Sequence, residues 1–227
     1  MSHTKITLPV IVQDHYAIPF EFRVFSETNN PEHPDETRFW QFPIKGERRG
    51  PFDPWQLRND FLTWPNEDWQ GFCRMFGYFW KPLISKNLFT EWQRLLRKAL
   101  ILPAREWKTL TKEFVMAGEY KPGLVEALLE PLKIRFDWDE EFPVARIREN
   151  SVLKKIIATI QVDALQGAQF RVCARHDCKN PPFQVEARQK IFCCSDCAHL
   201  VAVRNSRERA AKAKNKVAKN APNKMRL

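Results

Sequence analysis

The sequence FRVCARHDCKNPPFQVEARQKIFCCSDC, residues 170–197, holds five of the six cysteines of the chain. Cys173 and Cys178 form one close pair, and a second pair that ends at Cys197 follows after a short polar loop. A tetrahedral Zn²⁺ ion takes four thiolate ligands, and each pair supplies one edge of the tetrahedron. The spacing predicts one structural zinc ion, because four protein thiolates leave no open position for water or a substrate.

The third ligand is either Cys193 or Cys194, which are adjacent and whose side chains point in different directions. Cys194 and Cys197 have two residues between them, the usual spacing of a zinc knuckle. Cys193 and Cys197 have three, which fits if Cys197 lies in the first turn of a helix. The residue types alone leave both registers open. His176 and His199 are expected to be exposed rather than ligands, since four thiolates already suffice.

The positive charge of the chain is concentrated in its C-terminal quarter. Of the 37 Lys and Arg residues, 14 lie in residues 170–227 with only 4 of the 27 acidic residues, so the rest of the chain is neutral. A basic segment on a neutral body indicates a polyanionic partner, most often nucleic acid, either DNA or RNA, contacted through phosphates. A membrane-surface helix is not expected, because alanines rather than bulky apolar residues alternate with the charges. The predicted nucleic-acid-binding residues are Arg188, Lys190, Arg204, Arg207, Arg209, Lys212, Lys214 and Lys216.

Apolar periodicity predicts an α+β protein with a mostly helical body and small β-hairpin elements. Alternation indicates strands at residues 20–25 and 38–44, and a hairpin at residues 132–148. Helical spacing is clearest at Leu88, Phe89, Trp92, Leu95, Leu96, Ala99 and Leu100. Asp53 before Pro54 is typical of a helix start, and Ser151 begins another helix that Gly167 ends.

These signals predict five segments along the chain. They are a β-rich segment at 1–50, a helical region at 51–131, a hairpin plus helix at 132–169, a zinc finger with a basic helix at 170–210, and a flexible basic tail at 211–227. The aromatic residues of the helical region keep helical spacing, so we expect them to form a core rather than a platform for stacking bases.

The C-terminal pattern resembles a treble-clef zinc finger found at the C-terminus of many bacterial proteins, related to the CGNR-type fingers. The family pattern has an Arg-aromatic-Cys entry, a second Cys about four residues later, a Pro-Phe step, a basic loop, and an aromatic-Cys pair before an Arg-rich helix. This sequence has Cys173, Cys178, Pro182-Phe183, Arg188, Lys190 and Phe192-Cys193 in those places. Cys178-Lys179-Asn180-Pro181 stands where that family has Cys-Gly-Asn-Arg. The resemblance implies that Cys193 is the ligand and Cys194 a spare thiol. It also implies a DNA-binding, regulatory role.

No P-loop, HExxH, dinucleotide-binding or Gly-x-Ser-x-Gly motif is present, so neither an enzyme nor a small-molecule substrate is expected. The N-terminus does not read as a signal peptide and no run approaches the roughly 20 apolar residues of a membrane span, which predicts a cytoplasmic protein. Clustered thiols in that compartment favour metal over disulfides. Two other interpretations stay open. The aromatic-rich body could bind a protein partner, which would make the chain an adaptor, or Cys194 could act as a redox switch beside zinc.

Overall fold

The computed structural model describes residues 10–25, 38–44, 46, 48–77, 79, 83–116, 126–139, 142–149, 151–185 and 190–220. These residues form a mixture of helices and small sheets, which confirms the α+β class. The chain divides into two compact units, Met1–Phe170 and Arg171–Leu227.

The helices of the first unit begin where capping residues predict. Asp53 precedes α1 (Pro54–Thr63), and its side chain accepts a hydrogen bond from the Gln56 backbone N–H. Ser85 caps α3 (Lys86–Ile101) and Ser151 caps α6 (Val152–Leu165) in the same way. Each cap satisfies an amide that the first turn leaves without a helical partner. The remaining helices are α2 (Trp69–Phe76), α4 (Trp107–Met116) and α5 (Glu126–Leu129), with 3-10 turns at Asn66–Asp68 and Ala104–Glu106.

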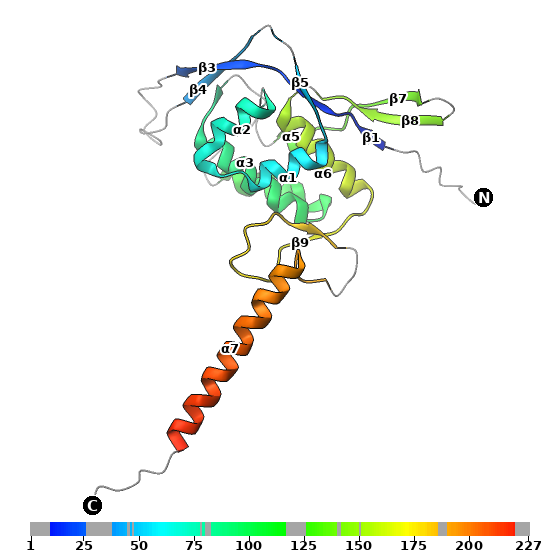
Figure 1. The fold of residues 1–227 in the computed structure, drawn as a ribbon. Helices are drawn as coiled ribbons and strands as arrows, with labels where there is room; N and C mark the ends of the chain where they lie inside the picture. The colour runs from blue at the N-terminus through cyan, green and yellow to red at the C-terminus, as the bar shows by residue number, and fades with distance from the viewer. Residues whose placement is uncertain are drawn as a thin grey trace, which may run out of the picture. The chain divides into compact units, whose positions relative to one another are not determined.

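An aromatic core lies among these helices, with α1, α3 and α6 packed against one another (Figure 1). Phe61, Phe72 and Phe89 are fully buried, and their rings meet edge to face with centroids 5.0–5.4 Å apart. Such tilted contacts suit the quadrupoles of aromatic rings. The prediction that the helical aromatic residues form a core is confirmed for these side chains.

Small sheets flank the helices. Strand β3 (Phe20–Phe25) pairs antiparallel with β4 (Arg38–Pro43), which also pairs with β6 (Leu83–Ile84). The predicted hairpin is confirmed as β7 (Ile134–Asp139) and β8 (Phe142–Ile147), and β1 (Val10–Val12) adds to β8 in parallel. The pairing of β1 with β8 joins residues more than 100 positions apart, which no local pattern could indicate.

One segment differs from the sequence expectation. The glycines and prolines of residues 46–54 are typical of a turn-rich connection, yet β5 (Arg49–Phe52) forms a strand that pairs antiparallel with β2 (His15–Ala17). Gly50 has φ +129°, and a Cβ there would lie 2.7 Å from the His15 carbonyl oxygen. The close approach of the two strands therefore requires glycine at this position.

A buried ion pair joins α1 to α6. Arg58 Nη1 lies 2.5 Å from Asp163 Oδ2, and both side chains are at most one-tenth exposed. The apolar pattern of α1 predicts Trp55 and Phe61 on one buried stripe, but Trp55 is only half-buried, and its Nε1 donates to Asp163 Oδ1 at 3.1 Å. A buried carboxylate needs hydrogen-bond donors, and Asp163 receives two of them, Arg58 Nη1 and the Trp55 indole N–H.

The second unit contains little regular structure before its long helix. Strands β9 (Phe170–Arg171), which begins at the last residue of the first unit, and β10 (Phe183–Gln184) form a two-stranded sheet. Helix α7 (Ser195–Asn220) continues past residue 210, where the sequence predicts the start of a basic tail. In the described part of this unit only Cys173, Pro182 and Cys197 are buried, so it has almost no apolar core.

Candidate metal centre

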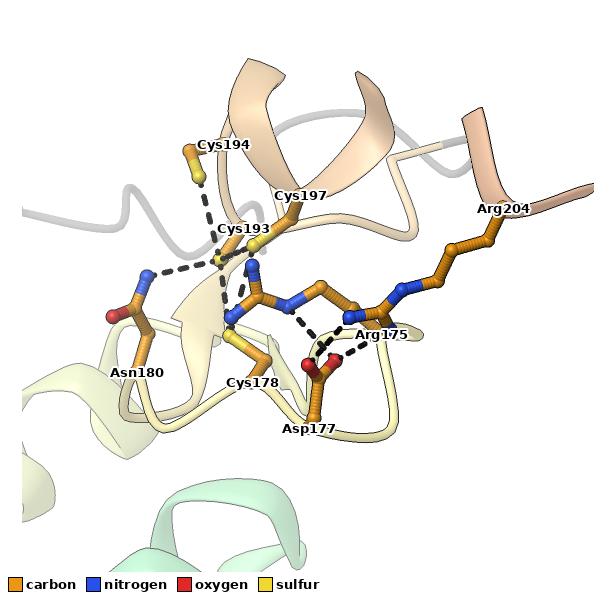
Figure 2. Close-up of polar contacts among 8 residues, drawn as sticks. All are labelled: Arg175, Asp177, Cys178, Asn180, Cys193, Cys194, Cys197 and Arg204. Carbon is orange, nitrogen blue, oxygen red and sulfur yellow. Dashed lines mark hydrogen bonds and ion pairs between the residues drawn. The ribbon is translucent and has the colours of Figure 1, made fainter. Parts of the chain in front are cut away.

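The sulfur atoms of Cys173, Cys178, Cys193 and Cys197 lie within 4.8 Å of one another. The Cys178–Cys193, Cys178–Cys197 and Cys193–Cys197 Sγ distances are 3.6, 3.7 and 3.4 Å, and Figure 2 shows these three side chains converging. A tetrahedral ion with metal–sulfur bonds of about 2.3 Å would separate its ligands by about 3.8 Å. The cluster therefore has the dimensions of a tetrathiolate site and can hold a metal ion.

Two short segments bring the cysteine pairs together. The first pair lies in a loop after β9, where the Cys178 N–H donates to the Arg175 carbonyl oxygen at 3.0 Å. The Ala174 N–H donates to the Ile191 carbonyl oxygen at 2.9 Å, which ties this loop to the segment before α7. Cys197 lies in the first turn of α7. A ligand in the first helical turn is what the Cys193 register, with three residues between Cys193 and Cys197, requires.

The geometry favours Cys193 over Cys194 as the third ligand. Asn180 Nδ2 donates to Cys193 Sγ at 3.2 Å, a contact that stabilises a thiolate and orients it. Cys194 is exposed, and its Sγ lies 3.8 Å from Cys193 Sγ but outside the four-sulfur group. His176 and His199 are exposed and do not belong to the group, as expected.

The thiols of the cluster differ in acidity. Burial opposes ionisation of Cys173, but hydrogen bonds with the backbone of Cys193 and Arg175 outweigh it and lower its pKa to about 7. Burial raises the pKa of the Cys193 and Cys197 thiols. Without a cation the Cys193 and Cys197 thiols therefore retain their protons at neutral pH, and a metal ion that binds there must displace them.

An ion pair beside the cluster connects the first cysteine loop to α7. Arg204 donates to both carboxylate oxygens of Asp177, at 3.0 and 2.8 Å, and Arg175 Nε lies 3.3 Å from the same carboxylate (Figure 2). Hydrogen bonding to Arg204 lowers the pKa of Asp177. Because Asp177 precedes the candidate ligand Cys178, the pair fixes α7 to the cluster at a second point.

The ion pair was missed in the sequence. Its two residues are 27 positions apart, and Arg204 was assigned to nucleic-acid binding. A carboxylate directly beside a cysteine ligand and an arginine two turns into the following helix are the only local signals for it.

The other predicted nucleic-acid-binding residues differ in exposure. Arg207, Arg209 and Lys212 are exposed on α7. Lys190 is half-buried, with its Nζ 5.7 Å from the centre of the Phe183 ring. The backbone of α7 carries Lys214 and Lys216, whose side chains are not described, and Arg188 lies outside the described residues.

Within the described residues, the four cysteines are the only His, Cys, Asp or Glu group of three or more that is compact enough to hold a metal ion. No helix in the described part of the chain combines the length and apolar character that crossing a membrane requires. Comparisons of the chain with protein-family models, with curated proteins and with solved structures found no match.

Proposed function

We propose that Cys173, Cys178, Cys193 and Cys197 bind one zinc ion in a treble-clef finger. Four soft sulfur ligands at tetrahedral spacing suit zinc and exclude the hard cations that prefer oxygen. The resemblance to CGNR-type fingers supports the same four ligands. The zinc is structural, because four thiolates complete its coordination.

The scarcity of buried apolar side chains supports this role for the metal. Cys173 and Cys197 account for two of the three buried residues described in the second unit, and both are proposed ligands. Segments of this size seldom bury enough apolar surface to fold alone, so metal binding supplies the missing free energy.

We also propose that the finger presents α7 to the phosphates of double-stranded DNA, in a regulatory protein. The observation that carries this proposal is a cationic helix that begins at the metal cluster and remains exposed. Helix α7 has seven Lys and Arg residues against two acidic ones. Every side chain from residue 205 to residue 213 is exposed. A helix with this charge and no apolar stripe suits phosphate contact better than a protein or membrane surface.

A mobility-shift assay with the zinc-loaded chain and a DNA duplex tests the proposal. Arg209, Lys212 and Lys216 occupy positions i, i+3 and i+7 of α7, a spacing that places residues on one side of a helix. Three phosphate contacts contribute about −2.7 to the slope of log Kobs against log salt. Replacing all three residues by alanine should make the slope shallower by about 2.7 and weaken binding.

The matched control removes the same charge from the body, where Lys86, Lys108 and Lys112 are exposed. This triple-alanine variant should bind as the unchanged chain does. Equal loss in both variants would show that net charge alone drives binding. Full binding by a chain that ends at Asn205, or by the chain stripped of metal, would refute the role of α7 or of zinc.

A further inference from the structure

The cluster contains one more thiol than a zinc ion needs. Cys194 lies directly before α7, and its carbonyl oxygen accepts the Ala198 N–H at 3.3 Å, which places it at the N-cap of the helix. Cys197 is then the third residue of the first turn. N-cap and third-position side chains lie next to each other in helices, as the capping box illustrates. The sequence Cys194-Ser195-Asp196-Cys197 therefore places an exposed thiol beside a ligand thiol that is only 2% exposed.

Backbone geometry selects the disulfide that this arrangement allows. Helical parameters place Cα atoms three residues apart about 5 Å from each other. Disulfides join Cα atoms about 4.4–6.8 Å apart, so a Cys194–Cys197 bond fits without moving the helix. The adjacent Cys193 and Cys194 have Cα atoms only about 3.8 Å apart, below that range, although their Sγ atoms are close.

We propose that Cys194 is an oxidation site that takes hydroperoxides and passes the oxidation to Cys197. This inference rests on the proposed zinc site, because its consequence is loss of the metal. Cys173 and Cys197 are buried and Cys178 and Cys193 are half-buried, and an ion bound to these four sulfurs would protect them, whereas Cys194 is open to solvent and is not needed as a ligand.

The oxidation proceeds in two steps, sulfenic acid formation and then disulfide formation. The Cys194 thiol loses its proton, the thiolate attacks one oxygen of hydrogen peroxide, and the O–O bond breaks. The departing hydroxide takes up a proton, so that a sulfenic acid and one water form. The Cys197 sulfur then attacks the Cys194 sulfur, an S–S bond forms, and the sulfenic oxygen leaves as a second water after taking up a proton. The two thiols lose two electrons in all, and one peroxide is reduced to two waters.

Oxidation in this way removes Cys197 from the ion while leaving the other three ligands unmodified. A closed tetrahedral site becomes an open three-thiolate site, which holds zinc more weakly. Because Cys197 lies in α7, the same bond detaches the start of the basic helix from the metal. A thiol reductant with added zinc should restore the site, since disulfide formation is reversible.

The test uses the full-length chain, whose zinc content is measured first. Hydrogen peroxide is then added, zinc release is followed with a chromogenic chelator, and the disulfide is identified by peptide mass spectrometry. We expect a Cys194–Cys197 disulfide, and we expect Cys194→Ser to release zinc about tenfold more slowly than the unchanged chain. The control Cys73→Ala changes the buried thiol in α2 and should release zinc at the unchanged rate.

The outcomes separate this inference from the proposed function. A chain that contains no zinc before oxidation overturns both. Stoichiometric zinc whose release is equally fast in Cys194→Ser, or a disulfide that joins other cysteines, overturns only the oxidation site and leaves the zinc finger standing.

Discussion

Exchanging one sulfur for oxygen at adjacent positions tests which thiol completes the metal site. Cys193→Ser removes a sulfur that lies 3.4 Å from Cys197 Sγ and 3.6 Å from Cys178 Sγ. Cys194→Ser removes a neighbouring sulfur that lies outside the four-sulfur group. The two variants make the same chemical change one residue apart, so each is the control for the other.

The magnitude follows from the number of ligands. Structural zinc sites have apparent binding free energies of about 10–16 kcal/mol, or roughly 2.5–4 kcal/mol for each of four ligands if they share it equally. Loss of that amount weakens binding by about 100-fold to 1,000-fold. Cys193→Ser also deprives Asn180 of its sulfur acceptor. We expect zinc affinity in Cys194→Ser to be unchanged.

Competition with a chelator of known zinc affinity, at fixed pH, measures both variants. Fixed pH is necessary because metal binding releases protons from thiols. If Cys194→Ser lost zinc while Cys193→Ser retained it, the shorter register would be correct, and the assignment based on sulfur distances would be refuted. Equal, large losses in both variants would mean that the two thiols exchange at the ion.

Three further predictions concern the ion pairs and the buried histidine. Asp163→Asn leaves Arg58 buried without its carboxylate and should cost about 3–5 kcal/mol of unfolding free energy in urea, with a loss under about 1 kcal/mol counting against it. Burial is the main cause that lowers the pKa of His15, so the folded state favours the neutral imidazole. The free energy of unfolding should therefore fall as the pH drops below about 6.5, where the unfolded state takes up a proton. His15→Gln should flatten that pH dependence. Asp177→Asn frees Arg204 for one more phosphate, so the salt slope of DNA binding should steepen by about 0.9, and an unchanged slope would contradict this.

Tryptophan fluorescence can follow unfolding of the first unit in the Asp163→Asn and His15→Gln experiments. All eight tryptophans lie before residue 170, so tryptophan fluorescence reports on the first unit alone. A metal-dependent change in the second unit will therefore not mask the fluorescence change that reports unfolding of the first unit.

Local signals predicted much of the fold. Asp53, Ser85 and Ser151 each precede a helix, and the side-chain oxygen of each accepts a hydrogen bond from the backbone N–H three residues later. Ser85 was not singled out in the sequence, although the apolar spacing after it predicted the helix itself. Alternation located the β7–β8 hairpin, because both strands and their turn are consecutive.

Features that depend on distant residues were not predicted. Strand β5 contains Gly50 and Pro51, which locally indicate a turn, and only its pairing with β2 makes it a strand. The Arg58–Asp163 pair requires knowing that α1 and α6 pack together. In each case the stabilising partner lies tens of residues away, where periodicity carries no information.

The candidate site was predictable in part. Two close cysteine pairs are a strong pattern because zinc fixes both the ligand type and the spacing, and the structure brings the four sulfurs together. The choice between Cys193 and Cys194 depends on where α7 begins and on the Asn180 contact, neither of which spacing determines. The pairing of Arg204 with Asp177 was likewise not predictable, because the two residues are 27 positions apart and spacing does not show that they meet.

Zinc-edge X-ray absorption on the full-length chain, purified without chelator, tests the central claim most directly. The account predicts one zinc per chain with four sulfur neighbours at about 2.3 Å. A chain without zinc, or a first coordination shell containing nitrogen or oxygen, would contradict it.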